Sequence, residues 1–193
     1  MKKYSKIFEV CGAFALGIGM LGSNVLADDL PSIGEMHPPV VASVGEKKVT
    51  VFFLKNNLKD KVQDEHVADA EIFYSPINSA KPSLNYVWKV EGDQIASVFF
   101  YDWKSSGRAG KSMYVLTKSK LSNSGFEGVT YSAMELSIIK NGDSLSVAFF
   151  SGDPSDPVLQ NCNEGRDLAM GKNLVCAYKD AGSIKKYLAT QDK

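Results

Sequence analysis

The chain has 193 residues, of which 44% are hydrophobic and 23% are charged, and its 22 basic residues balance its 22 acidic residues. A formal net charge of zero gives no general attraction to a phosphate backbone, so the composition argues against a nucleic-acid binder. After the N-terminal region, no apolar run approaches the roughly 20 residues that a membrane-spanning helix needs. The length favours one domain with a core of ordinary size.

The first 27 residues have the three-part pattern of a secretory signal peptide. Three lysines lie within the first six residues, residues 11–21 form an apolar stretch, and Val25-Leu26-Ala27 supplies compact residues before a cleavage point. The apolar stretch is too short to cross a bilayer as a helix. We therefore expect a signal peptide over residues 1–27, cleavage near Ala27, a periplasmic or secreted location and no membrane span in the mature protein.

The cysteine content agrees with export. Cys11 lies in the expected signal peptide, so Cys162 and Cys176 would be the two cysteines of the mature chain in an oxidising compartment. A bond between them closes a short loop, for which chain entropy gives about 3 kcal/mol. Their spacing is not that of a Cys-x-x-Cys redox pair, and a zinc site would need two further ligands, for which only His37 and His66 exist. The sequence predicts a structural disulfide and no metal site.

Residues 28–39 hold three of the seven prolines and are predicted to form an N-terminal arm before a single β-rich domain over residues 40–193. Runs of Val, Ile, Phe, Tyr and Thr, separated by turn residues, then dominate the chain. The predicted strands are residues 49–54, 71–74, 86–90, 95–103, 112–117, 129–139, 145–150 and 174–178. No long helical period lies between them, so the sequence favours a mainly β fold, an antiparallel sandwich or barrel built from hairpins.

Two segments have some helical character. Residues 58–70 contain two apolar residues at helical spacing among many charges, which leaves open an exposed helix or a loop. Residues 183–188 place Ile184 and Leu188 on one helical face. This spacing predicts a short C-terminal amphipathic helix that docks by its apolar side.

Two ten-residue segments resemble each other. EGDQIASVFF (residues 91–100) and NGDSLSVAFF (residues 141–150) align without a gap, and each follows a strand-like run. Asn141-Gly142 is typical of a two-residue hairpin turn. One interpretation is a duplicated hairpin unit with Phe99 and Phe149 on equivalent faces; the other is two unrelated hairpins of similar sequence. Both predict antiparallel strands joined by tight turns.

The stretch WKSSGRAGKSMYV (residues 103–115) contains Gly110-Lys111-Ser112, with which a nucleotide-binding P-loop ends. The first glycine of that motif is missing, because Ser105 takes its position. A strand-like run follows Ser112, whereas a P-loop is followed by a helix whose N-terminus faces the phosphate. The stretch is therefore predicted to be the tip of a β-hairpin, without nucleotide or other cofactor.

This hairpin tip is the candidate contact surface that the sequence favours. Residues 104–120 include five basic residues and no acid. Arg holds an anion by bidentate hydrogen bonds and Lys acts as a point charge, so the tip could bind an anionic group or an acidic protein partner in the envelope. The candidate binding residues are Trp103, Lys104, Arg108 and Lys111, with Trp103 partly exposed and Arg108 protruding. The alternative is a solvated hairpin tip.

No catalytic motif is present. The chain lacks a Gly-x-Ser-x-Gly nucleophile elbow. Asp153 and Asp156 suggest a calcium loop, but the further regularly spaced oxygen ligands of such loops are missing. A small exported β-protein with one disulfide resembles the bacterial periplasmic lysozyme inhibitors, and Ser106-Gly107 and residues 114–118 (YVLTK) are similar to short motifs of one such group. The spacing between these motifs differs from that of the group, so no residue role is carried over.

Three functions remain open. The first and preferred one is a non-enzymatic binding or inhibitory module of the envelope. The second is a secreted hydrolase whose catalytic carboxylates no sequence motif marks. The third is a structural or assembly subunit that uses an exposed strand edge. The sequence does not indicate an oligomeric state.

Overall fold

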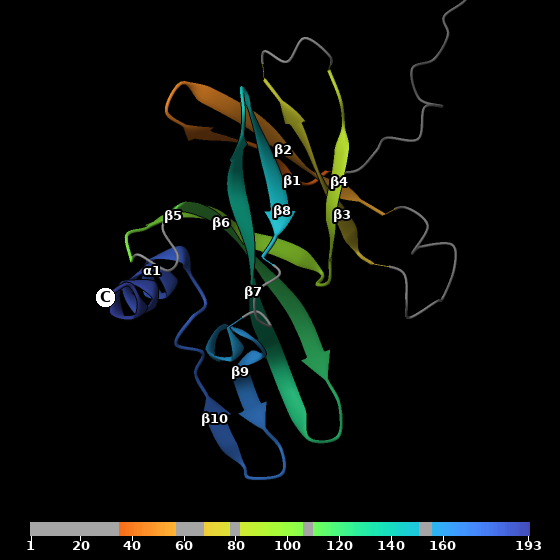
Figure 1. The fold of residues 1–193 in the computed structure, drawn as a ribbon. Coiled ribbons are helices and arrows are strands. Elements are labelled where there is room, and N and C mark those ends of the chain that lie inside the picture. Colours follow the sequence, from red (N-terminus) through yellow and green to blue (C-terminus); the bar gives the residue numbers. More distant parts are fainter. Residues whose placement is uncertain (1–34, 57–67, 78–81, 106–109, 151–155) are drawn as a thin grey trace, which may run out of the picture. The chain divides into compact units, whose positions relative to one another are not determined.

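The computed structural model describes residues 35–56, 68–77, 82–105, 110–150 and 156–193 (Figure 1). The described chain is mainly β, with two antiparallel sheets and one C-terminal helix, which confirms the predicted fold class. Within these residues no helix is long and apolar enough to cross a membrane. The first strand of the described residues begins at Glu35, so residues 35–39 of the expected arm belong to a strand.

The strands form a four-stranded sheet and a six-stranded sheet. The four-stranded sheet has the order β1 (Glu35–Val44), β2 (Lys47–Lys55), β3 (Ala70–Pro76) and β4 (Asn85–Val90). The six-stranded sheet has the order β10 (Lys172–Leu174), β9 (Cys162–Asp167), β7 (Phe126–Asn141), β6 (Gly110–Ser122) and β5 (Gln94–Trp103). The sixth strand, β8 (Ser144–Phe149), pairs with the C-terminal half of β7, whereas β9 pairs with its N-terminal half.

Two of the hairpins have two-residue turns that begin with glycine. Gly45 between β1 and β2 has a φ of 60°, and Gly142 between β7 and β8 has a φ of 52°. Glycine adopts positive φ without a steric penalty, as such turns require. Because Asn141 pairs with Ser144 in the ladder, the central residues of the second turn are Gly142 and Asp143, one position later than the predicted Asn141-Gly142.

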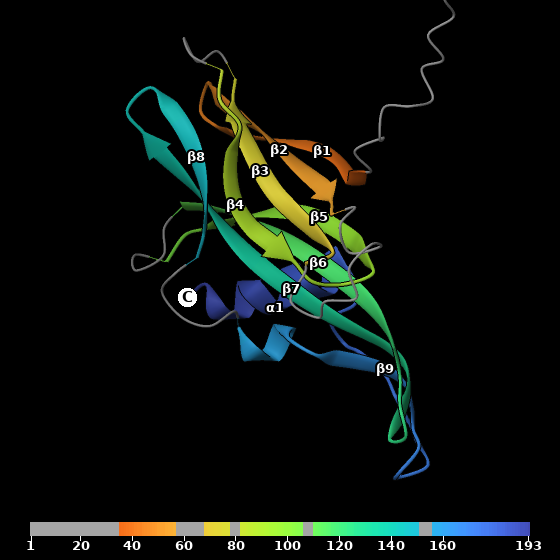
Figure 2. The ribbon, with the colours of Figure 1, turned by 90° about the vertical axis from the view of Figure 1, so that its right-hand side faces the viewer.

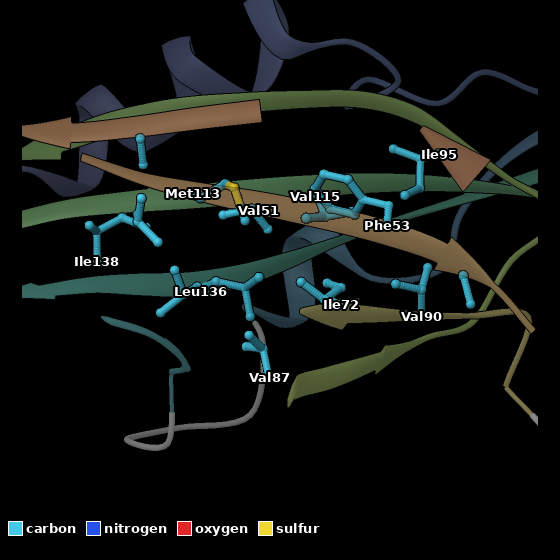
Figure 3. Close-up of a cluster of buried hydrophobic side chains, with 14 of the residues drawn as sticks. Val51, Phe53, Ile72, Val87, Val90, Ile95, Met113, Val115, Leu136 and Ile138 are labelled. Carbon is cyan, nitrogen blue, oxygen red and sulfur yellow. The ribbon is translucent and has the colours of Figure 1, made fainter. Parts of the chain in front are cut away.

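The main core lies between the two sheets (Figure 3). Alternate side chains of each strand point to one face, so every second residue of a strand reaches this core. Among its buried members are Val51, Phe53, Ile72, Met113, Val115 and Leu136. This is the packing of a β-sandwich, with apolar side chains of both inner faces in contact.

The opposite face of the six-stranded sheet is covered by the helix α1 (Ala181–Gln191) and the short 3-10 helix η2 (Pro157–Leu159) (Figures 1 and 2). Ile184 and Leu188 are buried there, which confirms the predicted amphipathic C-terminal helix. Its first turn is capped by Asp180, whose carboxylate accepts a hydrogen bond from the backbone N–H of Ser183 at 2.8 Å.

The duplication hypothesis is wrong. β4 belongs to the four-stranded sheet and β5 to the six-stranded sheet, so the segment between them crosses from one sheet to the other and does not form a hairpin. β7 and β8, in contrast, are a hairpin. Phe99 packs into the core under α1, while Phe149 packs against the core between the sheets. The two sequences are therefore similar because both turn into a strand, not because they are copies of one unit.

The predicted disulfide between Cys162 and Cys176 is present, with 5.3 Å between the two Cα atoms. It joins the first residue of β9 to the segment that follows β10. The strand predicted over residues 174–178 is wrong, because β10 ends at Leu174 and turns follow. Three observed strands were not predicted: β1 contains two prolines, β9 is polar, and the short β10 shares only Leu174 with the predicted strand.

Candidate functional site

The stretch that ends in Gly-Lys-Ser lies at the tip of the β5–β6 hairpin, as predicted. Trp103 pairs with Gly110 at the end of the ladder. A strand, and not a helix, follows the loop, so the geometry of a P-loop is absent. Arg108 and Ser106-Gly107 lie outside the described residues.

The expectation that Trp103 is partly exposed is wrong. Its side chain is only 5% exposed and belongs to the core under α1. It contacts the ring of Tyr101 edge to face at 4.9 Å, and its indole N–H donates a hydrogen bond to the carboxylate of Glu135 at 3.3 Å. The side chain points inward because Trp103 is still part of β5 and lies on the face that the helix covers. It therefore provides no aromatic surface for a partner.

The described part of this tip already holds carboxylates of its own chain. The backbone N–H groups of Lys104 and Ser105 donate to the carboxylate of Asp192 at 3.0 and 2.7 Å, and Lys111 lies 3.3 Å from the carboxylate of Asp102. Desolvation alone would raise the pKa of Asp192, but these backbone donors and neighbouring hydroxyls outweigh it and hold the pKa below its ordinary value. Binding of an external acidic partner by this tip stays a prediction.

A second surface has the features of a ligand site. A groove of about 450 Å³ lies at the end of the four-stranded sheet, over residues of the six-stranded sheet that the four-stranded sheet does not cover. One wall is the end of β4 and the turn after it, from Trp88 to Gly92. The floor comes from β6 and β7, and Phe149 and the segment Gln160-Asn161 complete the boundary. Figure 2 shows β6 and β7 extending past the four-stranded sheet.

The floor of the groove continues the inner face of the six-stranded sheet, but its side chains change from apolar to polar. Along β6 the inward residues are Met113 and Val115, followed by Thr117 and Ser119. Along β7, in the opposite chain direction, they are Ile138, Leu136 and Met134, followed by Ser132 and Thr130. The change to hydroxyl side chains coincides with the end of the opposing sheet. The sequence therefore builds a core at one end of this face and a polar floor at the other.

Trp88 provides an aromatic wall. It is 39% exposed and stacks on Phe149, with 4.5 Å between ring centroids and 16° between the ring planes. Phe149 covers one face of the indole, and the exposed part of Trp88 lines the groove. The pairing of β4 with β3 is irregular between Tyr86 and Trp88. Such β-bulges redirect the side chains next to them and are frequent beside functional sites.

The hydroxyls of the floor are not all satisfied. Thr117 donates to the backbone carbonyl of Ser132 at 3.2 Å, and the hydroxyl of Ser132 accepts from the backbone N–H of Asn161 at 3.1 Å. The buried hydroxyl of Thr130 has no hydrogen-bond partner among the described residues. A buried polar group without a partner costs roughly 1–3 kcal/mol, so its presence calls for an explanation.

The backbone at the boundary of the groove is held in an uncommon conformation. Asn161 has a φ of 51° and is the one non-glycine residue with positive φ in the described part of the chain. Asn tolerates this region better than most residues, and such conformations gather at functional sites. The disulfide at the next residue, Cys162, fixes this segment. The side-chain amide nitrogen of Gln160 donates a hydrogen bond to the backbone carbonyl of Ala133 at 2.6 Å, so the side-chain carbonyl oxygen of Gln160 points away from Ala133.

The charges at the groove cancel each other. Lys89 lies 2.5 Å from the carboxylate of Glu91, and this hydrogen bond raises the pKa of the lysine. Among the described residues that line the groove, Glu91 is the only carboxylate, so the paired acids of a glycosidase are not present there. The described residues also include no group of three or more metal-ligating side chains. The carboxylate of Asp156, considered above for calcium, accepts hydrogen bonds from the backbone of Val158 and from Tyr187.

The groove could not be predicted from the sequence, because its residues come from five separate segments of the chain. The signal that could have revealed it is a change within the alternating pattern of β6 and β7, where Thr and Ser replace Val, Leu and Met. The YVLTK motif also divides between the two faces. Tyr114 and Leu116 are buried under α1, whereas Thr117 lines the groove. The motif is therefore not a contact surface of its own.

Comparisons of the chain with protein-family models, with curated proteins and with solved structures give no match.

Proposed function

We propose that this protein is an exported, non-enzymatic binding module whose ligand lies in the groove. The observation that carries the proposal is the partly exposed Trp88, fixed by Phe149 beside a floor of Ser and Thr side chains. The volume of the groove is within the range of roughly 300–1,000 Å³ that small-molecule sites have. Binding rather than hydrolysis is favoured because the described lining offers one carboxylate, which is paired with a lysine.

Export is part of this proposal. The intramolecular disulfide suits an oxidising compartment, where such bonds persist. The N-terminal pattern adds a positively charged start, a short apolar stretch and a compact cleavage region. Mass spectrometry of protein isolated from an envelope fraction should find Asp28 as the first residue. Protein that retains Met1 would argue against export by this route.

The binding site can be tested with the two tryptophans of the chain as reporters, because Trp88 lines the groove and Trp103 is buried elsewhere. Fluorotryptophan-labelled mature protein is mixed with separated small-molecule, glycan and protein fractions of an envelope extract. We expect one fraction to shift the fluorine NMR signal of Trp88 and to leave that of Trp103 unchanged. The variant Trp88→Phe assigns the two signals.

The competing candidate surface provides the matched control. The double variant Lys104→Ser/Lys111→Ser removes two charges of the hairpin tip and leaves every groove residue in place. It should bind the active fraction as the wild type does. Loss of binding in this variant, with an unmoved Trp88 signal in the wild type, would assign the contact to the hairpin tip and contradict the groove.

A further inference from the structure

We infer that the ligand of the groove is an uncharged saccharide, with one sugar ring against the exposed part of Trp88 and its hydroxyl groups over the Ser and Thr floor. This inference rests on the proposed function and narrows it to one class of ligand. Three properties of the groove lead to it: a fixed aromatic face, a two-by-two arrangement of hydroxyls and the absence of net charge.

The first property is the aromatic wall. A sugar ring presents weakly polarised C–H groups on its face and hydroxyl groups around its rim. The face of an aromatic ring carries partial negative charge and attracts such C–H groups. Trp88 is already held in place by stacking on Phe149. Its side chain would therefore lose little conformational freedom when a ligand binds. This preorganisation lowers the entropic cost of placing a ligand against the exposed part.

The second property is the arrangement of the floor. Thr117 pairs directly with Ser132 across the β6–β7 ladder, and Ser119 pairs with Thr130. Side chains of directly opposite residues lie about 4.5–5.5 Å apart at Cβ, so the four hydroxyls form a compact grid. Each hydroxyl can donate one hydrogen bond and accept others, as sugar hydroxyls do. The grid can therefore exchange hydrogen bonds with a polyhydroxylated rim.

Two members of this grid have specific capacity left for a ligand. The hydroxyl of Ser132 accepts a bond from the backbone of Asn161, which leaves its own proton to donate. Thr130 lines the groove, while its hydroxyl oxygen is buried and lacks a partner within the described residues. A ligand hydroxyl would satisfy this group once the Thr130 side chain rotates about χ1 to turn its hydroxyl into the groove. The penalty of leaving Thr130 unpaired then becomes part of the driving force for binding.

The third property is charge. Lys89 and Glu91 neutralise each other at the rim, and the other described lining residues are uncharged at neutral pH. An anionic ligand would find no unpaired cation among these residues, and a cationic ligand no unpaired carboxylate. An extended peptide is a weaker candidate, because it would pair with a strand edge through its backbone and would not need the hydroxyl grid. Uncharged saccharides fit all three properties.

The test uses the disulfide-bonded mature protein and a fixed panel of probes. The neutral probes are glucose, galactose, mannose and N-acetylglucosamine and their common disaccharides, with glucuronic acid and glucosamine as charged counterparts. Binding is measured by the fluorine signal of Trp88 and by calorimetry. We expect at least one neutral disaccharide to shift the Trp88 signal in a saturable manner and to bind at least tenfold more tightly than the charged sugars.

Variants distinguish the groove from adventitious contacts. Trp88→Ala should abolish binding of that disaccharide, and Thr130→Val should weaken it about tenfold, which corresponds to about 1.4 kcal/mol. Tyr86→Ala is the matched control, because Tyr86 is an exposed aromatic residue of the same strand that does not line the groove. It should bind as the wild type does. Equal losses in Trp88→Ala and Tyr86→Ala would overturn the assignment to the groove.

The remaining outcomes separate the two proposals. If no saccharide of the panel moves the Trp88 signal but a fraction of envelope extract does, the saccharide inference is wrong and the binding function stands. If neither moves it, both are wrong. If a charged sugar of the panel saturates the site as tightly as the neutral probes, the argument from neutrality is overturned.

Discussion

The inner face of the six-stranded sheet has two ends that differ in their side chains and in what lies opposite them. Along the inner face of β6 and β7, the end that the four-stranded sheet covers carries Met113, Val115, Leu136 and Ile138, all buried. The other end carries Thr and Ser side chains, and the opposing sheet does not reach it. The strands are the same and their hydrogen-bonded ladder is continuous. What differs is the identity of alternate side chains and the layer that stands opposite them.

This difference separates, within a single pair of strands, the end that supplies stability from the end that we propose for recognition. Burial of apolar area supplies most of the stability of a fold, so the covered end should dominate the free energy of unfolding. No second sheet of the described chain packs on the uncovered end. It is held instead by the pairing of β7 with β9 and by the disulfide at the start of β9. This support allows the floor to carry Ser and Thr side chains, which range from buried (Thr117) to partly exposed, where the covered end carries apolar ones.

The largest effect should come from the covered end. Leu136 is fully buried between the sheets, and Leu136→Ala removes three carbon atoms from a packed core. Substitutions of this kind cost roughly 2–5 kcal/mol. Urea unfolding should show the loss as a lower midpoint with an unchanged slope. A cost below that of an exposed substitution would mean that the sheets are not packed here as described.

The second effect concerns the support of the uncovered end. Removing the disulfide with Cys162→Ser/Cys176→Ser opens a loop of 14 residues in sequence separation. The chain-entropy estimate for a loop of this size is about 3 kcal/mol. Unfolding of the double variant, compared with that of the oxidised wild type, should show this loss. Because Asn161 precedes Cys162 at the groove, ligand binding should weaken as well, whereas Leu136→Ala should leave the affinity of the folded protein unchanged.

The third effect tests how closely β9 approaches β7. Gly165 faces Gly128 in this pairing, and a Cβ at Gly165 would lie 2.6 Å from the Cα of Gly128. Its φ of 154° adds strain for any other residue. Gly165→Ala should therefore cost about 1–3 kcal/mol, as overpacking does. The control is Gly125→Ala, where the nearest atom would be 3.6 Å away and the expected change is within about 0.5 kcal/mol.

Sequence patterns predicted the parts of the molecule that follow from local chemistry. The apolar period of residues 183–188 predicted the helix that buries Ile184 and Leu188, and the presence of two cysteines outside the expected signal peptide predicted the disulfide. The pairing of strands could not be predicted from local patterns of this kind. Residues 86–100 look like a hairpin because they contain strand, turn and strand, yet the turn carries the chain from one sheet to the other. Which sheet a strand joins depends on contacts far away in sequence.

The candidate sites show the same limit. The basic hairpin tip is a continuous segment, so the sequence made it visible, but its Trp103 is turned inward by the helix that packs on that face. The groove could not be read from the sequence, because its wall, floor and boundary come together only when two sheets of unequal extent are stacked. Only the change from Met and Val to Thr and Ser in alternate positions was available beforehand, and such a change is also typical of a strand that leaves the core for solvent.

The smallest expected changes in stability concern two threonines of the groove floor, and they test whether this end of the sheet serves the fold. Thr130 and Thr117 both lie on the floor, but Thr117 donates to the carbonyl of Ser132, while the buried hydroxyl of Thr130 has no partner in the described structure. Valine retains the branched shape and the strand propensity of threonine in both places.

Thr117→Val should therefore cost about 0.5–1.5 kcal/mol, the usual contribution of a hydrogen bond, whereas Thr130→Val should leave the stability unchanged or raise it, because an unsatisfied polar group is removed. The urea unfolding midpoints of the two variants, measured without ligand, show whether only Thr117→Val loses stability. Equal losses in both would show that the hydroxyl of Thr130 is satisfied in solution, for example by an ordered water. A ligand would then have to displace that partner, and the affinity assigned to this hydroxyl would fall. If Thr130→Val is instead neutral for folding and harmful for binding, the uncovered end of the sheet carries a group kept for a ligand rather than for the fold.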